Sequence, residues 1–222
     1  SETPGGAAWW ADLAPASDDA QVLPMVAAAL GVTASGPGAR AQLIDALGAR
    51  HGLLVLDNCE HRVGAVADLV QALRDAAPGM SWLATSQTPL QLHSEQSFRL
   101  GTLEVPDAGA GLDSARQCGA IALLEQRARA GDLHFALDCA TLPPAIEICR
   151  RLDGLALAIE MAAARLPALG VGGVHAMLGA RLDRLSSERR DVPLRQRSLL
   201  AALDWSCSLL SDAQRQALQA LA

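Results

Sequence analysis

The chain has 222 residues, half of them hydrophobic and 19% charged, so it can bury the core of one large domain or two small ones and is not a disordered tail. Its formal net charge of −6 argues against a broad nucleic-acid-binding surface. All 18 basic residues are arginine. The lack of lysine excludes the phosphate-loop consensus G-x-x-x-x-G-K-S/T within the chain, because that motif needs a lysine on the β- and γ-phosphates.

Cysteine and histidine spacing gives no support to a disulfide framework or a metal enzyme. The five cysteines are scattered without a C-x-x-C pair, which favours reduced thiols in a cytoplasmic protein. The five histidines show no H-x-x-x-H or H-E-x-x-H spacing, and no G-x-S-x-G element indicates a nucleophilic hydrolase. No apolar run approaches the roughly 18 residues of a membrane span, and we expect no secretion signal.

Strand and helix patterns alternate through the first part of the chain. Hydrophobic runs predict strands over 7–15, 52–57, 80–90 and 96–106, the first leaving the core at Asp12 and the last directing Phe98 and Leu100 inward. Helical periodicity is predicted over 18–32, 39–50 and 62–78, with Asp18 or Asp19 as the first N-cap and Gly31 as its stop. This alternation predicts a parallel α/β sheet with covering helices.

After Pro106 the sequence becomes helical throughout. Helical stretches joined by Gly and Pro breaks predict an all-α domain over 107–185, after a partial α/β domain over 1–106. The charged segment at the start of 186–222 reads as a linker, and its arginines, like Arg150 and Arg151, are better explained as solvated charges than as a DNA-binding surface. A further helical unit begins near residue 198.

The segment "GLLVLDNCEH", residues 52–61, has the pattern of a buried parallel strand that ends in a carboxylate, Asp57. Nucleotide-binding folds hold Mg²⁺ at such a sheet edge. The alternative is an ordinary strand-ending aspartate that caps the next turn.

Four motifs in order extend this observation: "LLVLDNCEH", "LATSQTPLQLHSEQSFRLGTLEVPDA", "EICRRLDGLALAIEMAAARL" and "RQRSLLAALDWSCSLLSDAQR". Together they resemble the NB-ARC-like branch of the STAND signal-transduction ATPases, modules of large bacterial transcriptional regulators of the LuxR and SARP types. The resemblance implies a partial P-loop-NTPase-type sheet, a helical domain resembling ARC1 over 107–185, and the beginning of a winged-helix domain within 186–222. The family's P-loop is then expected immediately before Ser1.

The resemblance also implies site residues. Asp57 corresponds to the Walker B aspartate, which binds Mg²⁺ through water, and Glu60 to a group that polarises the attacking water, although Glu60 is equally suited to capping the next helix. Asn58 stands where many ATPases carry a second acid.

Two further motifs differ from the family pattern. Thr85, Ser86 and Gln87 match the sensor strand, where relatives commonly carry an arginine that reports the γ-phosphate; neutral Gln87 cannot supply that charge, and Thr85 and Ser86 are equally good strand-end caps. "GLALA" matches the Gly-Leu-Pro-Leu-Ala motif that packs over the nucleotide, with Gly154 for a tight turn, Leu155 as apolar surface and Ala156 in place of proline. For Leu155 and Leu157, core packing is the favoured role.

Two functions from different classes follow. In the first, the chain carries the Walker B side and helical lid of an ATP/ADP-dependent switch that uses Mg²⁺, in a parent protein that is a slow ATPase; the chain alone is then inactive and binds no nucleotide tightly. In the second, it is a degenerate, non-catalytic scaffold for protein–protein contact. The expected partners are other domains of the parent regulator and a second copy through an exposed sheet edge, with no direct nucleic-acid or membrane binding.

Overall fold

The computed structural model describes residues 6–180, 207, 210 and 212–221. The chain divides between Phe98 and Arg99 into two units, each with its own hydrophobic core. The predicted linker at the start of 186–222 and most of the segment predicted to begin a winged-helix domain lie outside the described residues, which in this range include helix α10 (Asp212–Leu221).

The first unit is built on a parallel sheet. Its strands are β1 (Ala7–Asp12), β2 (Gly52–Asp57) and β3 (Met80–Ala84), and they lie side by side in the order β1-β2-β3. The connections are helical, as parallel strands require: η1 (Asp19–Gln21), α1 (Val22–Ala29), η2 (Gly36–Gly38) and α2 (Ala39–Leu47) before β2, then η3 (Cys59–His61) and α3 (Val63–Ala76) before β3. The predicted alternation of strands and helices is therefore confirmed up to residue 84.

Local sequence signals set the ends of these elements. The Asp18 carboxylate accepts a hydrogen bond from the Gln21 amide at 3.1 Å, which makes it the predicted N-cap. Gly31, at φ +66°, follows the end of α1, where the left-handed conformation favours glycine. In α3 the apolar face is buried, with Val66 and Leu73 fully enclosed.

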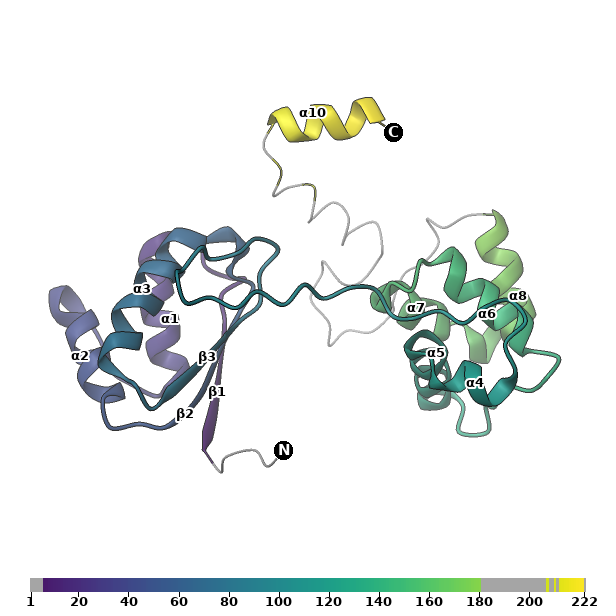
Figure 1. Ribbon diagram of the computed structural model, residues 1–222, viewed down its shortest axis with the longest axis horizontal. Coiled ribbons are helices and arrows are strands. Elements are labelled where there is room, and N and C mark those ends of the chain that lie inside the picture. The colour runs from purple at the N-terminus through teal and green to yellow at the C-terminus, as the bar shows by residue number, and fades with distance from the viewer. Residues whose placement is uncertain (1–5, 181–206, 208–209, 211, 222) are drawn as a thin grey trace. The chain divides into compact units, whose positions relative to one another are not determined.

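Helices α1, α2 and α3 all lie on one side of the sheet (Figure 1). Beneath them, alternate strand residues such as Trp9 and Leu54 join the core of this unit. The opposite face carries the row Trp10–Val55–Leu83, in which Trp10 is 61% and Leu83 51% exposed. Parallel sheets are ordinarily covered on both faces, so this apolar row is an unusual surface for a parallel strand set.

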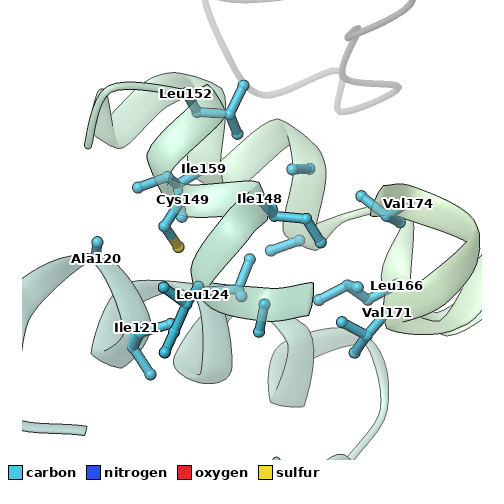
Figure 2. Packing of buried hydrophobic residues seen from close by; sticks show 14 of the residues in the cluster. Ala120, Ile121, Leu124, Ile148, Cys149, Leu152, Ile159, Leu166, Val171 and Val174 are labelled. Carbon is cyan, nitrogen blue, oxygen red and sulfur yellow. The ribbon is translucent and has the colours of Figure 1, made fainter. Parts of the chain in front are cut away.

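The second unit consists of helices: α4 (Leu112–Gln117), α5 (Gly119–Gly131), α6 (Leu142–Arg151), α7 (Ala156–Ala163) and α8 (Leu166–Ala180), the last interrupted at Gly170. Their apolar side chains interlock in one cluster, in which Ile121 and Leu124 of α5, Ile148 of α6 and Ile159 of α7 are fully buried (Figure 2). The predicted helical character of 107–185 is confirmed for the described part of that range.

One charged side chain is buried in this helical core. The Glu125 carboxylate is 8% exposed and accepts hydrogen bonds from Arg116 at 3.0 and 3.2 Å, from Arg129 at 2.9 Å and from the Leu137 amide at 3.4 Å. Burial alone would raise the pKa of Glu125, but the hydrogen bonds from Arg116 and Leu137 and the two arginine charges outweigh it and lower the pKa. Glu125 therefore ties α4, α5 and the loop before α6 together.

The prediction of a strand over 96–106 is wrong. These described residues form no strand, and Phe98 and Leu100, predicted to point inward, are 88% and 86% exposed. Instead, the helical unit holds the segment by its backbone: the Leu103 amide donates to the Gly154 carbonyl at 2.9 Å, and the Glu104 carbonyl accepts from the Ala120 amide at 3.1 Å. The division between the units accordingly falls before residue 99 rather than after Pro106.

Among the described residues, no single helix is long and apolar enough to cross a membrane; α7 and α8 reach that composition only as a pair that is bent by 119°.

Candidate functional site

The carboxyl ends of the strands bring polar residues together at one edge of the sheet. Asp57 ends β2, and Asp12, at the end of β1, is its direct partner in the strand register. Thr85 follows β3 and is held there by a hydrogen bond from its amide to the Leu56 carbonyl at 2.9 Å. Because all three strands run in the same direction, their ends meet at this edge although they are far apart in sequence.

The Asp57 carboxylate is fixed from two sides. Its Oδ1 accepts a hydrogen bond from the Thr85 hydroxyl, and its Oδ2 accepts one from Asn58 Nδ2 at 3.0 Å. The side chain is half-buried, so it retains access to solvent. The arrangement presents an oriented carboxylate at the sheet edge, which is the donor type that Mg²⁺ prefers.

Asn58 connects this carboxylate to the neighbouring strand. Its Nδ2 also donates to Asp12 Oδ1 at 2.9 Å, and its backbone amide donates to Thr85 Oγ1 at 3.0 Å. The residue has left-handed backbone angles, φ 62° and ψ 51°, which asparagine tolerates better than most residues. Asp12 is held in turn by the Ala14 amide at 2.9 Å.

Glu60 lies one turn further on, in η3. Its side chain is 7% exposed, and its carboxylate lies 3.9 Å from His61 Nε2. Within the described part of the chain, Glu60 is not a member of the hydrogen-bonded group around Asp57, and the predicted cap on the next helix is not made, since α3 begins without a side-chain cap.

Cys59, between these acids, is fully buried. Burial, with smaller effects from the Glu60 and Asp57 charges, raises the pKa of its thiol to about 12. The thiol is therefore protonated at neutral pH, which excludes Cys59 as a nucleophile.

The remaining residues of the predicted sensor strand point elsewhere. Ser86 Oγ accepts from the Thr88 amide at 3.2 Å, the arrangement of a turn cap, and both Ser86 and Gln87 are exposed. Of the three, only Thr85 joins Asp57.

Gly154, Leu155 and Ala156 belong to the helical unit. Gly154, at φ +67°, makes the turn between α6 and α7, and a Cβ there would lie 2.2 Å from the Leu103 carbonyl oxygen, so only glycine fits. Ala156 is the first residue of α7, a position that also accepts proline. Core packing is confirmed for Leu157, which packs against the helical cluster, but the prediction is wrong for Leu155, which is 45% exposed because it precedes the helix and points out of the core.

A cation at this edge would depend on few protein ligands. Within the described ranges no three His, Cys, Asp or Glu side chains converge in the manner of a metal-binding cluster. Asp57 and Asp12 fit Mg²⁺ nonetheless, because this ion is commonly held by one or two carboxylates, with waters and substrate phosphates completing its shell. The sequence analysis did not predict that Asp12 lies at this site. Its position at the end of a predicted strand of the same sheet was the feature that could have indicated it.

No family model matches the chain. Over 205 residues, 92% of this chain and 22% of the relative, it is 33% identical to the Mycobacterium tuberculosis protein named "Putative HTH-type transcriptional regulator Rv0890c". Over 216 residues, 96% of this chain and 52% of the relative, it is 33% identical to "Uncharacterized protein Rv0894" of the same organism. The chain thus spans about a fifth of the length of the first relative and about half of the second. The similarity to the first relative supports a family of transcriptional regulators.

Proposed function

We propose that this chain is the Walker B side and helical lid of an ATP/ADP-dependent switch in a bacterial transcriptional regulator of the cytoplasm. Asp57 would hold Mg²⁺ through water, Glu60 would polarise the attacking water, and a phosphate loop in the same parent polypeptide would bind the phosphates. The parent is a slow ATPase of the STAND and NB-ARC-like kind, with its sheet unit of the P-loop-NTPase type and a winged-helix domain after the helical unit.

The observation that carries the proposal is the fixed carboxylate of Asp57 at the carboxyl edge of a parallel sheet. Thr85 and Asn58 orient both of its oxygens, and the next strand brings Asp12 alongside. Ligands of open α/β sheets bind outside the carboxyl ends of the strands. An oriented, solvent-accessible carboxylate at that edge supports a role in binding the metal of a nucleotide.

Three further features agree with the proposal. The exposed row of Trp10 and Leu83 offers an apolar face that other parts of the parent regulator, or a second copy of the chain, would cover. Exposed Leu155 at the start of α7 offers apolar surface for a nucleotide base, with Gly154 and Ala156 shaping the turn beside it. The similarity to proteins named as transcriptional regulators supports the biological setting.

A degenerate scaffold is the second candidate, and Gln87 is the observation that favours it. A neutral, exposed side chain stands where the switch family uses arginine to detect the γ-phosphate. In that case the site geometry would be inherited and would no longer bind nucleotide.

The test is nucleotide binding by the full-length parent protein and by this chain. We expect the parent to retain ADP or ATP through purification, and Asp57→Ala to weaken Mg-ATP binding at least tenfold in calorimetry. Asp68→Ala, which removes an exposed carboxylate on α3, is the matched control and should leave affinity unchanged. This chain alone should show no micromolar binding of Mg-ATP, because it has no lysine for a phosphate loop. The scaffold function would be established instead if the parent protein carries no nucleotide and its signalling is unchanged by Asp57→Ala.

A further inference from the structure

Asn58 makes contacts that the acid expected at its position could not make. One nitrogen, Nδ2, donates to two carboxylates that come from different strands: Asp57 Oδ2 at 3.0 Å and Asp12 Oδ1 at 2.9 Å. An aspartate has no donor to offer when ionised, and it would add a third negative charge to the edge. The amide thus has a chemical role distinct from that of a catalytic acid.

Backbone conformation is the competing explanation for asparagine at this position. The left-handed φ of 62° by itself favours Asn or Gly over other residues. If that were the whole reason, glycine would serve as well, because it adopts positive φ without strain. The side-chain contacts and the backbone preference are therefore separable by substitution.

We propose that Asn58 is a positioning residue whose carboxamide links the Asp12 and Asp57 carboxylates. Two carboxylates within hydrogen-bond distance of one nitrogen would otherwise repel each other and turn apart. With the amide between them, and with the Thr85 hydroxyl on the other oxygen, the Asp57 carboxylate keeps a single orientation. The use of that orientation for Mg²⁺ rests on the proposed function, whereas the link itself is a property of this chain without nucleotide.

Thermal unfolding of the chain, followed by tryptophan fluorescence, tests the link. Three of the four tryptophans lie in the strands of the sheet unit. We expect Asn58→Gly to lower the Tm of this unit by roughly 4 °C or more, the shift that corresponds to the loss of about one hydrogen-bonded contact in a domain of this size. Gln91→Gly is the matched control: Gln91 also has positive φ (60°), is exposed and lies in the same unit, so glycine there should keep or raise the Tm.

Two further measurements separate a linking role from a merely structural one. In an Asp12→Ala background, Asn58→Gly should lower the Tm by less than half as much as in the wild type, because one of the two linked groups is already gone. Asn58→Asp keeps the shape and the tolerance of positive φ but replaces the donor by a carboxylate. Asn58→Asp should therefore have a lower Tm than the wild type in EDTA, and millimolar Mg²⁺ should bring its Tm back up. The same Mg²⁺ should leave the Tm of Asn58→Gly unchanged.

Three results would overturn the proposal: a Tm for Asn58→Gly within about 1 °C of wild type, additive effects with Asp12→Ala, or no response of Asn58→Asp to Mg²⁺. None of these measurements uses nucleotide. A parent protein that fails to bind ATP would refute the proposed function and leave the link intact. A parent that binds ATP, together with any of the three results above, would refute the link and leave the proposed function intact.

Discussion

Replacing Gly154 by alanine should destabilise its unit far more than the same change at another left-handed glycine destabilises its own. Gly154 and Gly31 have almost the same φ, +67° and +66°, and each follows the end of a helix, so alanine causes similar conformational strain at both, about 1 kcal/mol. Their surroundings differ: no atom lies within 4 Å of a Cβ built on Gly31, whereas a Cβ on Gly154 would lie 2.2 Å from the Leu103 carbonyl oxygen. Gly31→Ala is therefore the matched control.

The extra cost at Gly154 comes from moving the backbone near Leu103. That movement breaks the 2.9 Å hydrogen bond from the Leu103 amide to the Gly154 carbonyl, worth about 1 kcal/mol, and disturbs the packing of Leu103 on the helical core, worth about 1–2 kcal/mol. We expect Gly154→Ala to lower the free energy of unfolding of the helical unit by about 3–4 kcal/mol, and Gly31→Ala to lower that of the sheet unit by about 1 kcal/mol.

Hydrogen exchange measures each loss in its own unit, through the α6 and α7 amides for Gly154→Ala and the α1 amides for Gly31→Ala. At about 1.4 kcal/mol per tenfold change, the expected excess of about 2–3 kcal/mol means that exchange accelerates, relative to wild type, roughly 30- to 100-fold more in Gly154→Ala than in Gly31→Ala. Equal accelerations in the two variants would refute the close approach of residue 103 to the α6–α7 turn, and with it the assignment of 99–106 to the helical unit.

The buried Glu125 and the buried thiols give further predictions. Glu125→Gln should lower the free energy of unfolding by about 2–3 kcal/mol in a urea titration, because it weakens the hydrogen bonds from two arginines that keep partial access to water. The control Glu147→Gln, on the surface of α6, should lower it by less than about 0.5 kcal/mol in the same titration. Since folding lowers the pKa of Glu125, its contribution is complete above the unfolded pKa of about 4.3 and is lost as the pH falls through the lower pKa of the folded state. A wild-type advantage over Glu125→Gln that did not decline with falling pH below about 4.3 would contradict this. Burial raises the pKa of the Cys59 and Cys149 thiols to about 12 each. Both should react with a thiol reagent at pH 7 far more slowly than exposed Cys139, and unfolding the protein in denaturant should abolish this difference.

The sequence predicted most of the sheet unit because its signals are local. Asp18 and Gly31 mark the ends of one helical connection, and a continuous apolar run from residue 52 to Asp57 marks the buried central strand. These features depend on neighbours a few residues apart, which a reader of the sequence can see directly.

The segment 96–106 shows where this reasoning fails. Its alternation of Phe98 and Leu100 has the period of a strand, but the backbone at residues 103 and 104 bonds to the α6–α7 turn and to the start of α5 instead. The prediction that Leu155 packs in the core failed for a related reason: the apolar character of a residue at a helix start does not determine whether its side chain points into the core or out of it.

The sequence by itself determined the parallel α/β unit, the helical unit and Asp57 as the carboxylate at the strand end. Only the tertiary structure decided which groups surround that carboxylate. Thr85 reaches it directly, and Asp12 through Asn58, because parallel strands separated by helices of unequal length end at one edge in a register that no local pattern encodes. A site assembled from three strand ends depends on that register, and register is fixed by packing across the whole sheet.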